Sequence, residues 1–212
     1  MTEPWLDRWQ EGRIGWHEAD GNASLKKHWR ATGRTVFVPM CGKSVDLRWI
    51  AAQGNRVVGV ELSDVAVESF FAEQDLAFRV SENELLRYDA IDADITIYCG
   101  DLFELTSIRC DAHYDRGALI ALPAVQRSAY ASHVGSLLSN DAEQLVITLD
   151  YDEEVAKGPP FSVGDEELLE YWPGLDCVEQ RDDIANAPPK FLDAGLTEFN
   201  EKVWRSCSGR SG

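Results

Sequence analysis

The chain has 212 residues, and its 44% of hydrophobic side chains are enough to build the apolar core of one large domain. Acidic residues outnumber basic residues by 37 to 20, and the resulting net charge of −17 disfavours nucleic acids and anionic membranes as partners. The five irregularly spaced cysteines, with no signal peptide or long apolar run, predict a cytoplasmic protein without disulfides, bound metal or membrane spans.

Residues 1–33 precede the first predicted strand and are expected to form a helical lid segment rich in tryptophan. Trp5 and Trp29 are expected to pack on the edge of the sheet. We assign Trp9 and Trp16 to a ligand instead, because aromatic faces attract a cationic group such as a sulfonium.

A βαβ unit is predicted for residues 35–63. The apolar runs at 36–38 and 57–60 are typical of buried strands, and the second run ends on the acid Glu61. Between them, the proline and glycine of 39–44 predict a turn, and helical spacing of apolar residues follows it. This order of elements is half of a nucleotide-binding α/β fold.

The acid of this unit is placed to bind a ribose. Glu61 follows Gly42 by 19 residues, and a carboxylate at the end of that strand suits two vicinal hydroxyls. The turn lacks a G-x-G-x-x-G motif, and Met40 and Cys41 would hinder the approach of a pyrophosphate. An adenosine ligand without a bridging diphosphate, such as S-adenosylmethionine, is therefore favoured over NAD. A purely structural unit with an incidental acid stays open on this stretch alone.

The rest of the chain continues the alternation of helices and strands. Further helices are predicted at 64–74, 124–138 and 165–171, and further strands at 78–80, 94–99, 112–115, 144–149, 177–183 and 197–204. About seven strands then form the sheet, and right-handed crossovers place helices on both of its faces.

Several polar residues fall where predicted strands end. Asp101 either addresses an adenine or caps a turn, and the pair Asp115 and Arg116 either faces the ligand or forms a structural ion pair. Two proline-marked loops, at 158–163 and 188–191, could reach the same edge of the sheet.

Six segments in this order resemble the thiopurine S-methyltransferase family, and in particular its bacterial members. They are the segment with Trp5, Trp9 and Trp16, then VPMCGKSVDLRWIAAQG, VVGVELSDVAVESFFAEQ, IYCGDLF, YDRGALIALP and the GPPFSV loop. The resemblance implies a class I S-adenosylmethionine-dependent methyltransferase fold, a seven-stranded Rossmann-like sheet whose last strand is antiparallel. It also implies methyl transfer to the sulfur of aromatic and heterocyclic thiols, and in bacterial relatives to selenium or tellurium species.

The resemblance also implies roles for particular residues. The family's cofactor contacts fall on Trp9, Met40, Glu61, Asp101, Leu102 and Arg116. Trp16 matches the aromatic residue that covers cofactor and substrate, and Phe161 and Lys190 are assigned to the acceptor. Arg116 is expected to position the acceptor thiolate, with no general base and no metal.

Two of these residues, one assigned to the cofactor and one to the acceptor, differ from the family pattern. Met40 stands where the family usually has leucine, a change of similar volume. Lys190 stands where relatives often carry arginine, so the planar bidentate fork is lost at that position.

One methyltransferase domain is expected over residues 1–212, with an α/β core at 34–205 and a flexible tail at 206–212. The expected product is S-adenosylhomocysteine, the expected partner is a small-molecule thiol or other soft nucleophile, and the expected state is a monomer. A halide or thiocyanate methyltransferase and a non-catalytic S-adenosylmethionine-binding module remain alternatives. An NAD-binding oxidoreductase is a more distant one.

Overall fold

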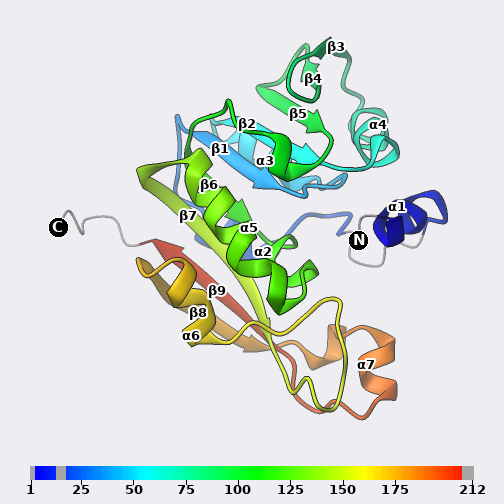
Figure 1. Cartoon of the computed structure of the whole chain (residues 1–212), viewed down its shortest axis with the longest axis vertical. Helices are drawn as coiled ribbons and strands as arrows, with labels where there is room; N and C mark the ends of the chain where they lie inside the picture. Colours follow the sequence, from blue (N-terminus) through cyan, green and yellow to red (C-terminus); the bar gives the residue numbers. More distant parts are fainter. Residues whose placement is uncertain (1–2, 13–17, 207–212) are drawn as a thin grey trace. The chain divides into compact units, whose positions relative to one another are not determined.

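The computed structural model describes residues 3–12 and 18–206 (Figure 1). Contacts divide the chain into two compact units. The first comprises Met1–His113 and Leu137–Ala142, and the second comprises Tyr114–Ser136 and Glu143–Gly212. Trp16 and nearly all of the predicted tail lie outside the described residues.

The first unit contains most of the parallel strands. Its elements are α1 (Glu3–Gln10), α2 (Ala23–His28), β1 (Thr35–Pro39), α3 (Asp46–Ala52), β2 (Arg56–Glu61), α4 (Asp64–Glu73), β3 (Phe78–Glu82), β4 (Leu86–Ala90), β5 (Ile95–Cys99), a 3₁₀ turn (Leu102–Glu104) and most of β6 (Cys110–Asp115). The strands are ordered β3-β4-β5-β2-β1-β6. Strands β5, β2, β1 and β6 run parallel, and β3 and β4 add an antiparallel hairpin beside β5.

The predicted βαβ unit is confirmed as β1, α3 and β2. Phe37 of β1, Leu47 and Ile50 of α3 and Val57 of β2 are fully buried, which is the reason for the apolar runs in the sequence. The parallel pairing of β1 with β2 brings both strand ends to the same edge of the sheet.

The second unit contains the end of β6, a 3₁₀ turn (Leu119–Ala121), α5 (Ala124–Leu137), the end of β7 (Leu138–Asp150), α6 (Asp165–Tyr171), β8 (Leu175–Asp182), a 3₁₀ turn (Ile184–Asn186), α7 (Pro189–Asp193) and β9 (Asn200–Ser206). Strand β9 is antiparallel to both β7 and β8, which confirms the prediction for the last strand. Helices α6 and α7 lie near opposite ends of β8 and β9 (Figure 1). An apolar cluster in this unit contains Leu149, Tyr151, Ala156, Ala187, Phe191, Leu196 and Phe199.

The α/β class is as predicted, and the number of strands needs correction. The described residues form nine strands, whereas the sequence predicted about seven. The unpredicted strand β4 lies beside β3, whose five residues are all exposed, so neither strand of the hairpin shows a clear apolar pattern. Among residues 3–12 and 18–206, no helix has the length and apolar character needed to cross a membrane.

Candidate functional site

Glu61, at the end of β2, is held by backbone amides. Its Oε2 accepts a hydrogen bond of 2.8 Å from the amide of Gly42, in the turn between β1 and α3. Its Oε1 accepts one of 2.9 Å from the amide of Ser63, the N-cap of α4. A carboxylate has about four acceptor positions, so each oxygen keeps a lone pair for a further donor. The predicted ribose acceptor is thus oriented by the chain before any ligand binds.

The environment of Glu61 has opposing effects on its ionisation. Burial raises the pKa of Glu61, and the amides of Ser63 and Gly42 act against this rise by stabilising the charged form. Because both oxygens accept from N–H groups, the geometry is that of an ionised carboxylate.

Trp9 of α1 lies against the same turn. Gly42 has a φ of +52°, and a Cβ atom built on it would lie only 3.0 Å from Cζ2 of Trp9, so the indole ring rests on the glycine. Met40 has a φ of 46°, which is unusual for a residue with a side chain. The structure therefore brings Trp9, Met40 and Glu61 together around one turn, and strained backbone of this kind is common at functional sites.

Asp101 and Leu102 follow β5, the strand next to β2. Cys99 pairs with Glu61 across the two strands, and the amide of Gly100 donates to the carbonyl of Glu61 at 2.9 Å. Oδ1 of Asp101 accepts from the amide of Phe103 at 2.9 Å, which caps the 3₁₀ turn. Turn capping, one of the two predicted roles of this acid, is therefore present, and Leu102 is buried beside it.

Two cysteines beside Glu61 were not predicted as part of the site. Burial, together with the charge of Glu61, holds the pKa of Cys41 well above its usual value. Burial and neighbouring acids raise the pKa of Cys99 to about 11. Both therefore carry neutral thiols at neutral pH, and their position at or just after strand ends was the only signal in the sequence.

Arg116 lies in the second unit, on a turn shaped by Asp115. The carboxylate of Asp115 is almost completely buried and accepts from the amides of Ala118 at 3.0 Å and Leu119 at 3.3 Å. It also accepts from the hydroxyl of Tyr130 at 2.7 Å. These three donors give Asp115 a structural role in the turn. Arg116, the next residue, is half-buried.

Lys190 and Phe161 are brought together at the proline loop, residues 157–163. Nζ of Lys190, on α7, donates to the carbonyl of Lys157 at 3.1 Å and to that of Pro159 at 2.8 Å. The amide of Phe161 donates to the carbonyl of Ile120 at 2.7 Å. The two proline-marked segments of the sequence are thus neighbours.

Tyr151 and Arg127 contribute to this loop and were missed as site residues. The hydroxyl of Tyr151 donates to the carbonyl of Pro160 at 2.6 Å. The guanidinium of Arg127 lies over the ring of Phe161, 5.9 Å from its centroid, and forms a 2.8 Å ion pair with Glu167 of α6. The Asp-Tyr-Asp sequence at the end of β7 was a signal for Tyr151, whereas Arg127 sits inside an ordinary helical pattern.

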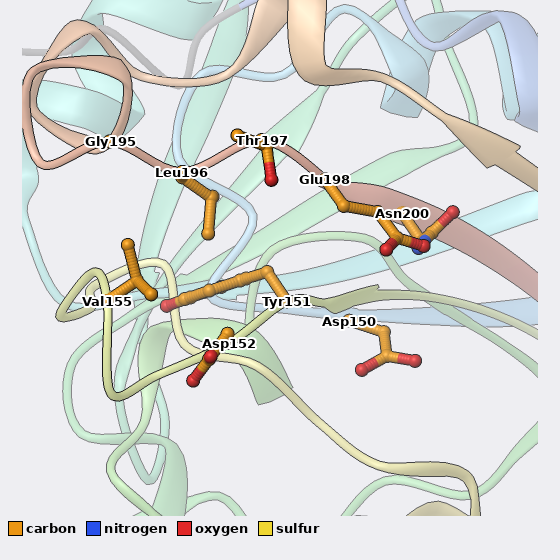
Figure 2. A pocket seen from close by; sticks show the side chains of 9 residues that line it. All are labelled: Asp150, Tyr151, Asp152, Val155, Gly195, Leu196, Thr197, Glu198 and Asn200. Carbon is orange, nitrogen blue, oxygen red and sulfur yellow. The ribbon is translucent and has the colours of Figure 1, made fainter.

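A cavity of about 370 Å³ lies at the end of β7 and the start of β9. Figure 2 shows the ring of Tyr151 across it, with Val155 and Leu196 toward the hydroxyl end and Glu198 beyond the backbone end. Its three acids each accept a hydrogen bond: Asp150 from Lys202 at 2.7 Å, Asp152 from the backbone amide of Glu154 at 2.8 Å, and Glu198 from the side-chain amide of Asn200 at 2.7 Å. Within the described part of the chain, no group of three or more His, Cys, Asp or Glu side chains is placed to hold a metal ion.

The fold is that of the class I S-adenosylmethionine-dependent methyltransferases. It is similar to the structure of 1,6-didemethyltoxoflavin-N1-methyltransferase from Burkholderia thailandensis, with a TM-score of 0.64 and 18% identity over 98% of this chain and 87% of that chain. It is also similar to magnesium protoporphyrin IX methyltransferase from Synechocystis, with a TM-score of 0.64 and 14% identity over 98% of this chain and 100% of that chain. Both structures contain S-adenosylhomocysteine.

Sequence comparison gives the family within this class. The family model described as thiopurine S-methyltransferase matches residues 1–208. The thiopurine S-methyltransferase of Bordetella petrii is 43% identical over 96% of this chain and 97% of its own length, and that of a Pseudomonas fluorescens strain is 42% identical over 95% and 94%. The chain belongs to the thiopurine S-methyltransferase family, and it is an S-adenosylmethionine-dependent methyltransferase. Glu61, with its remaining lone pairs beside Gly42 and Trp9, fits the ribose of this cofactor.

Proposed function

We propose that the chain methylates the sulfur of aromatic and heterocyclic thiols, including thiopurines. The observation that carries this proposal is the identity of 43% and 42% to two thiopurine S-methyltransferases over nearly the whole chain. Selenium and tellurium species are further candidate acceptors, since they are also soft nucleophiles.

In the first unit, we assign the cofactor to the residues around Glu61. The two unused lone pairs of Glu61 accept the ribose hydroxyls, and Trp9 and Met40 flank the turn that carries Gly42. Leu102 and the turn capped by Asp101 lie on the neighbouring strand end, where the adenine is expected. Trp16, outside the described residues, is proposed to cover cofactor and acceptor.

When bound, S-adenosylmethionine supplies the electrophilic methyl group and the leaving group, so the chain needs to position and desolvate the acceptor. The acceptor's sulfur lone pair forms the new S–C bond while the sulfonium–methyl bond breaks. Aromatic and heterocyclic thiols ionise near neutrality, and no strong base is required. Arg116 cannot act as a base because its guanidinium stays protonated in proteins, and we assign it to the stabilisation of the acceptor thiolate.

An acceptor panel with labelled cofactor tests the proposed function. Thiophenol and a thiopurine are expected to be methylated, and selenite, tellurite, iodide and thiocyanate complete the panel. Turnover of iodide or thiocyanate without turnover of any thiol would identify a halide-type methyltransferase instead. No turnover of any acceptor would indicate a binding module.

The pH–rate profile of Arg116→Ala with thiophenol tests the role of Arg116. Loss of the nearby positive charge is expected to move the rise of kcat/KM to higher pH, because more of the acceptor is then a neutral thiol. A kcat/KM equal to that of the wild type at every pH would exclude this role.

We also propose a cytoplasmic monomer in which residues 1–212 act as one domain on a small molecule. The net charge of −17 supports a small molecule over a nucleic acid. Sedimentation velocity tests the monomer, and a single unfolding transition that shifts with S-adenosylhomocysteine tests the single domain.

A further inference from the structure

The proline loop, residues 157–163, depends on donors from outside it. Pro159 and Pro160 have no backbone N–H, so this part of the loop cannot form a ladder with a strand, and its carbonyls need other partners. Side chains supply them: Lys190 reaches the carbonyls of Lys157 and Pro159, and Tyr151 reaches that of Pro160.

Lys190 is directed at the loop by its own helix. It lies in the first turn of α7, and its ammonium, 4.8 Å from the ring centroid of Phe191, donates to two carbonyls of the loop. An ammonium has three donors, and these two bonds commit most of them to the chain itself.

Tyr151 is tied to the same helix through the apolar cluster. Its ring lies 5.0 Å from that of Phe191 and 5.6 Å from that of Phe199, measured between centroids. Burial raises the pKa of Tyr151 well above its usual value, so its hydroxyl stays a donor across the physiological range. The two donors of the loop are thus coupled through Phe191, the residue after Lys190.

The loop in turn fixes Phe161. A Cβ atom on Gly158 would lie 2.3 Å from Cδ1 of Phe161, so the ring rests directly on that glycine. The amide of Phe161 is bonded to Ile120, and Arg127 lies over the ring. The backbone at 157–160 thus forms one side of the support of the phenyl ring.

We propose that Lys190 and Tyr151 are positioning residues that hold the proline loop, and through it Phe161, in the geometry that receives the acceptor. In this chain Lys190 bonds backbone carbonyls and does not serve as the anchor of a negative charge on the acceptor. This inference rests on the proposed function, because the acceptor is taken to be an aryl thiol.

Two acceptors that differ by one carboxylate separate positioning from charge recognition. The Lys190→Met variant keeps the length of the side chain and removes its donors. The KM for thiophenol and the KM for 4-mercaptobenzoate are both expected to rise by the same factor, roughly three- to tenfold, with kcat nearly unchanged. Lys190→Arg is expected to restore both values, since a guanidinium can donate to the same two carbonyls.

Lys157→Met is the matched control. It removes one positive charge from the loop itself, as Lys190→Met removes one from the helix beside it, and leaves the backbone carbonyl of Lys157 in place, so both KM values are expected to match the wild type. In the Tyr151→Phe variant, both KM values are expected to rise in parallel. In the double variant Lys190→Met with Tyr151→Phe, KM is expected to rise by less than the product of the two single factors, because both substitutions release the same loop.

Hydrogen exchange of the loop amides gives a readout independent of catalysis. The amides of Phe161, Ser162 and Val163 are expected to exchange faster in Lys190→Met and in Tyr151→Phe, and at the wild-type rate in Lys157→Met. A KM that rises for 4-mercaptobenzoate alone, or unchanged exchange in both variants, would overturn the proposal. If the wild type methylates neither thiol, the proposed function fails, and the exchange rates alone decide whether the loop is held in this way.

Discussion

Replacement of Glu61 by glutamine tests the arrangement of the cofactor site. The substitution keeps the size of the side chain, but one carboxylate oxygen becomes an NH₂ group. Because both oxygens of Glu61 accept from backbone amides, the glutamine would turn its NH₂ toward either Gly42 or Ser63, and two donors would face each other. The variant therefore loses a bond within the turn as well as an acceptor for the ribose.

The buried position of Glu61 sets the size of both effects. A buried N–H left without an acceptor costs about 1–3 kcal/mol, which is the expected loss in the free energy of unfolding without cofactor. A hydrogen bond to a charged acceptor is worth about 1.5–3 kcal/mol, so the Kd of S-adenosylhomocysteine is expected to rise roughly 10- to 100-fold.

Calorimetric titration with S-adenosylhomocysteine and urea unfolding measure the two effects separately. Glu68→Gln is the matched control, because Glu68 is exposed on α4 and loses the same charge. A Kd unchanged in Glu61→Gln would refute the ribose assignment. An unchanged free energy of unfolding would refute the role of the two amide bonds.

The raised pKa of Glu61 gives these two quantities opposite pH dependences. A folded-state pKa above the ordinary value of 4.5 means that the folded protein binds the proton more tightly than the unfolded chain. This contribution to stability is present at low pH and is lost as the pH rises through the folded-state pKa. Cofactor affinity needs the carboxylate and rises over the same range. Both trends are expected to disappear in Glu61→Gln, and their persistence there would assign them to another group.

Three further substitutions test the supports of the site by urea unfolding. Gly42→Ala places a side chain at a φ of +52° and against Trp9. The free energy of unfolding is expected to fall by about 1–2 kcal/mol, and the binding of S-adenosylhomocysteine is expected to weaken. An unchanged free energy of unfolding would show that the substitution causes no strain. Asp115→Asn places an NH₂ group where the carboxylate accepts from two backbone amides and the hydroxyl of Tyr130. The free energy of unfolding is expected to fall by about 1–3 kcal/mol. An unchanged free energy of unfolding would show that the turn does not need the acid. Arg127→Met removes a buried guanidinium that donates to the carbonyl of Leu122 and pairs with Glu167. The free energy of unfolding is expected to fall by about 1–3 kcal/mol. A more stable variant would mean that the cost of desolvating the guanidinium exceeds the stabilisation from these two partners.

The sequence predicts elements well where burial determines residue type on both faces. Strands β1 and β2 are buried parallel strands, so they appear as short apolar runs between turn residues. Strand β4 was not predicted because much of it is only partly buried and its sequence is polar. Its residues Arg87 and Asp89 are joined by a side-chain hydrogen bond of 2.8 Å. The first part of β7 was missed for a related reason, since it follows α5 directly and is polar.

In the candidate site, too, some contacts could be predicted from the sequence and others could not. The position of Glu61 beside Gly42 could be predicted because the spacing of the two residues follows from the geometry of a βαβ unit. Its two amide donors could not, because they depend on the conformation of the turn. The pair of Arg127 with Glu167 joins residues 40 positions apart, and nothing in either local pattern identifies the other.

On the proposed placement of the cofactor, the thiols of Cys41 and Cys99 would give this enzyme a form of chemoselectivity. The nucleophilic form of a cysteine is the thiolate, and with a pKa of about 11 roughly one Cys99 side chain in ten thousand is ionised at neutral pH. Burial suppresses the ionisation of Cys41 in the same direction. With the cofactor placed at Glu61 as proposed, its alkyl group would have two endogenous sulfur atoms nearby that do not compete for it. The acidity of an aryl thiol would then distinguish the acceptor from the protein, and self-methylation would be avoided although sulfur atoms lie in the site.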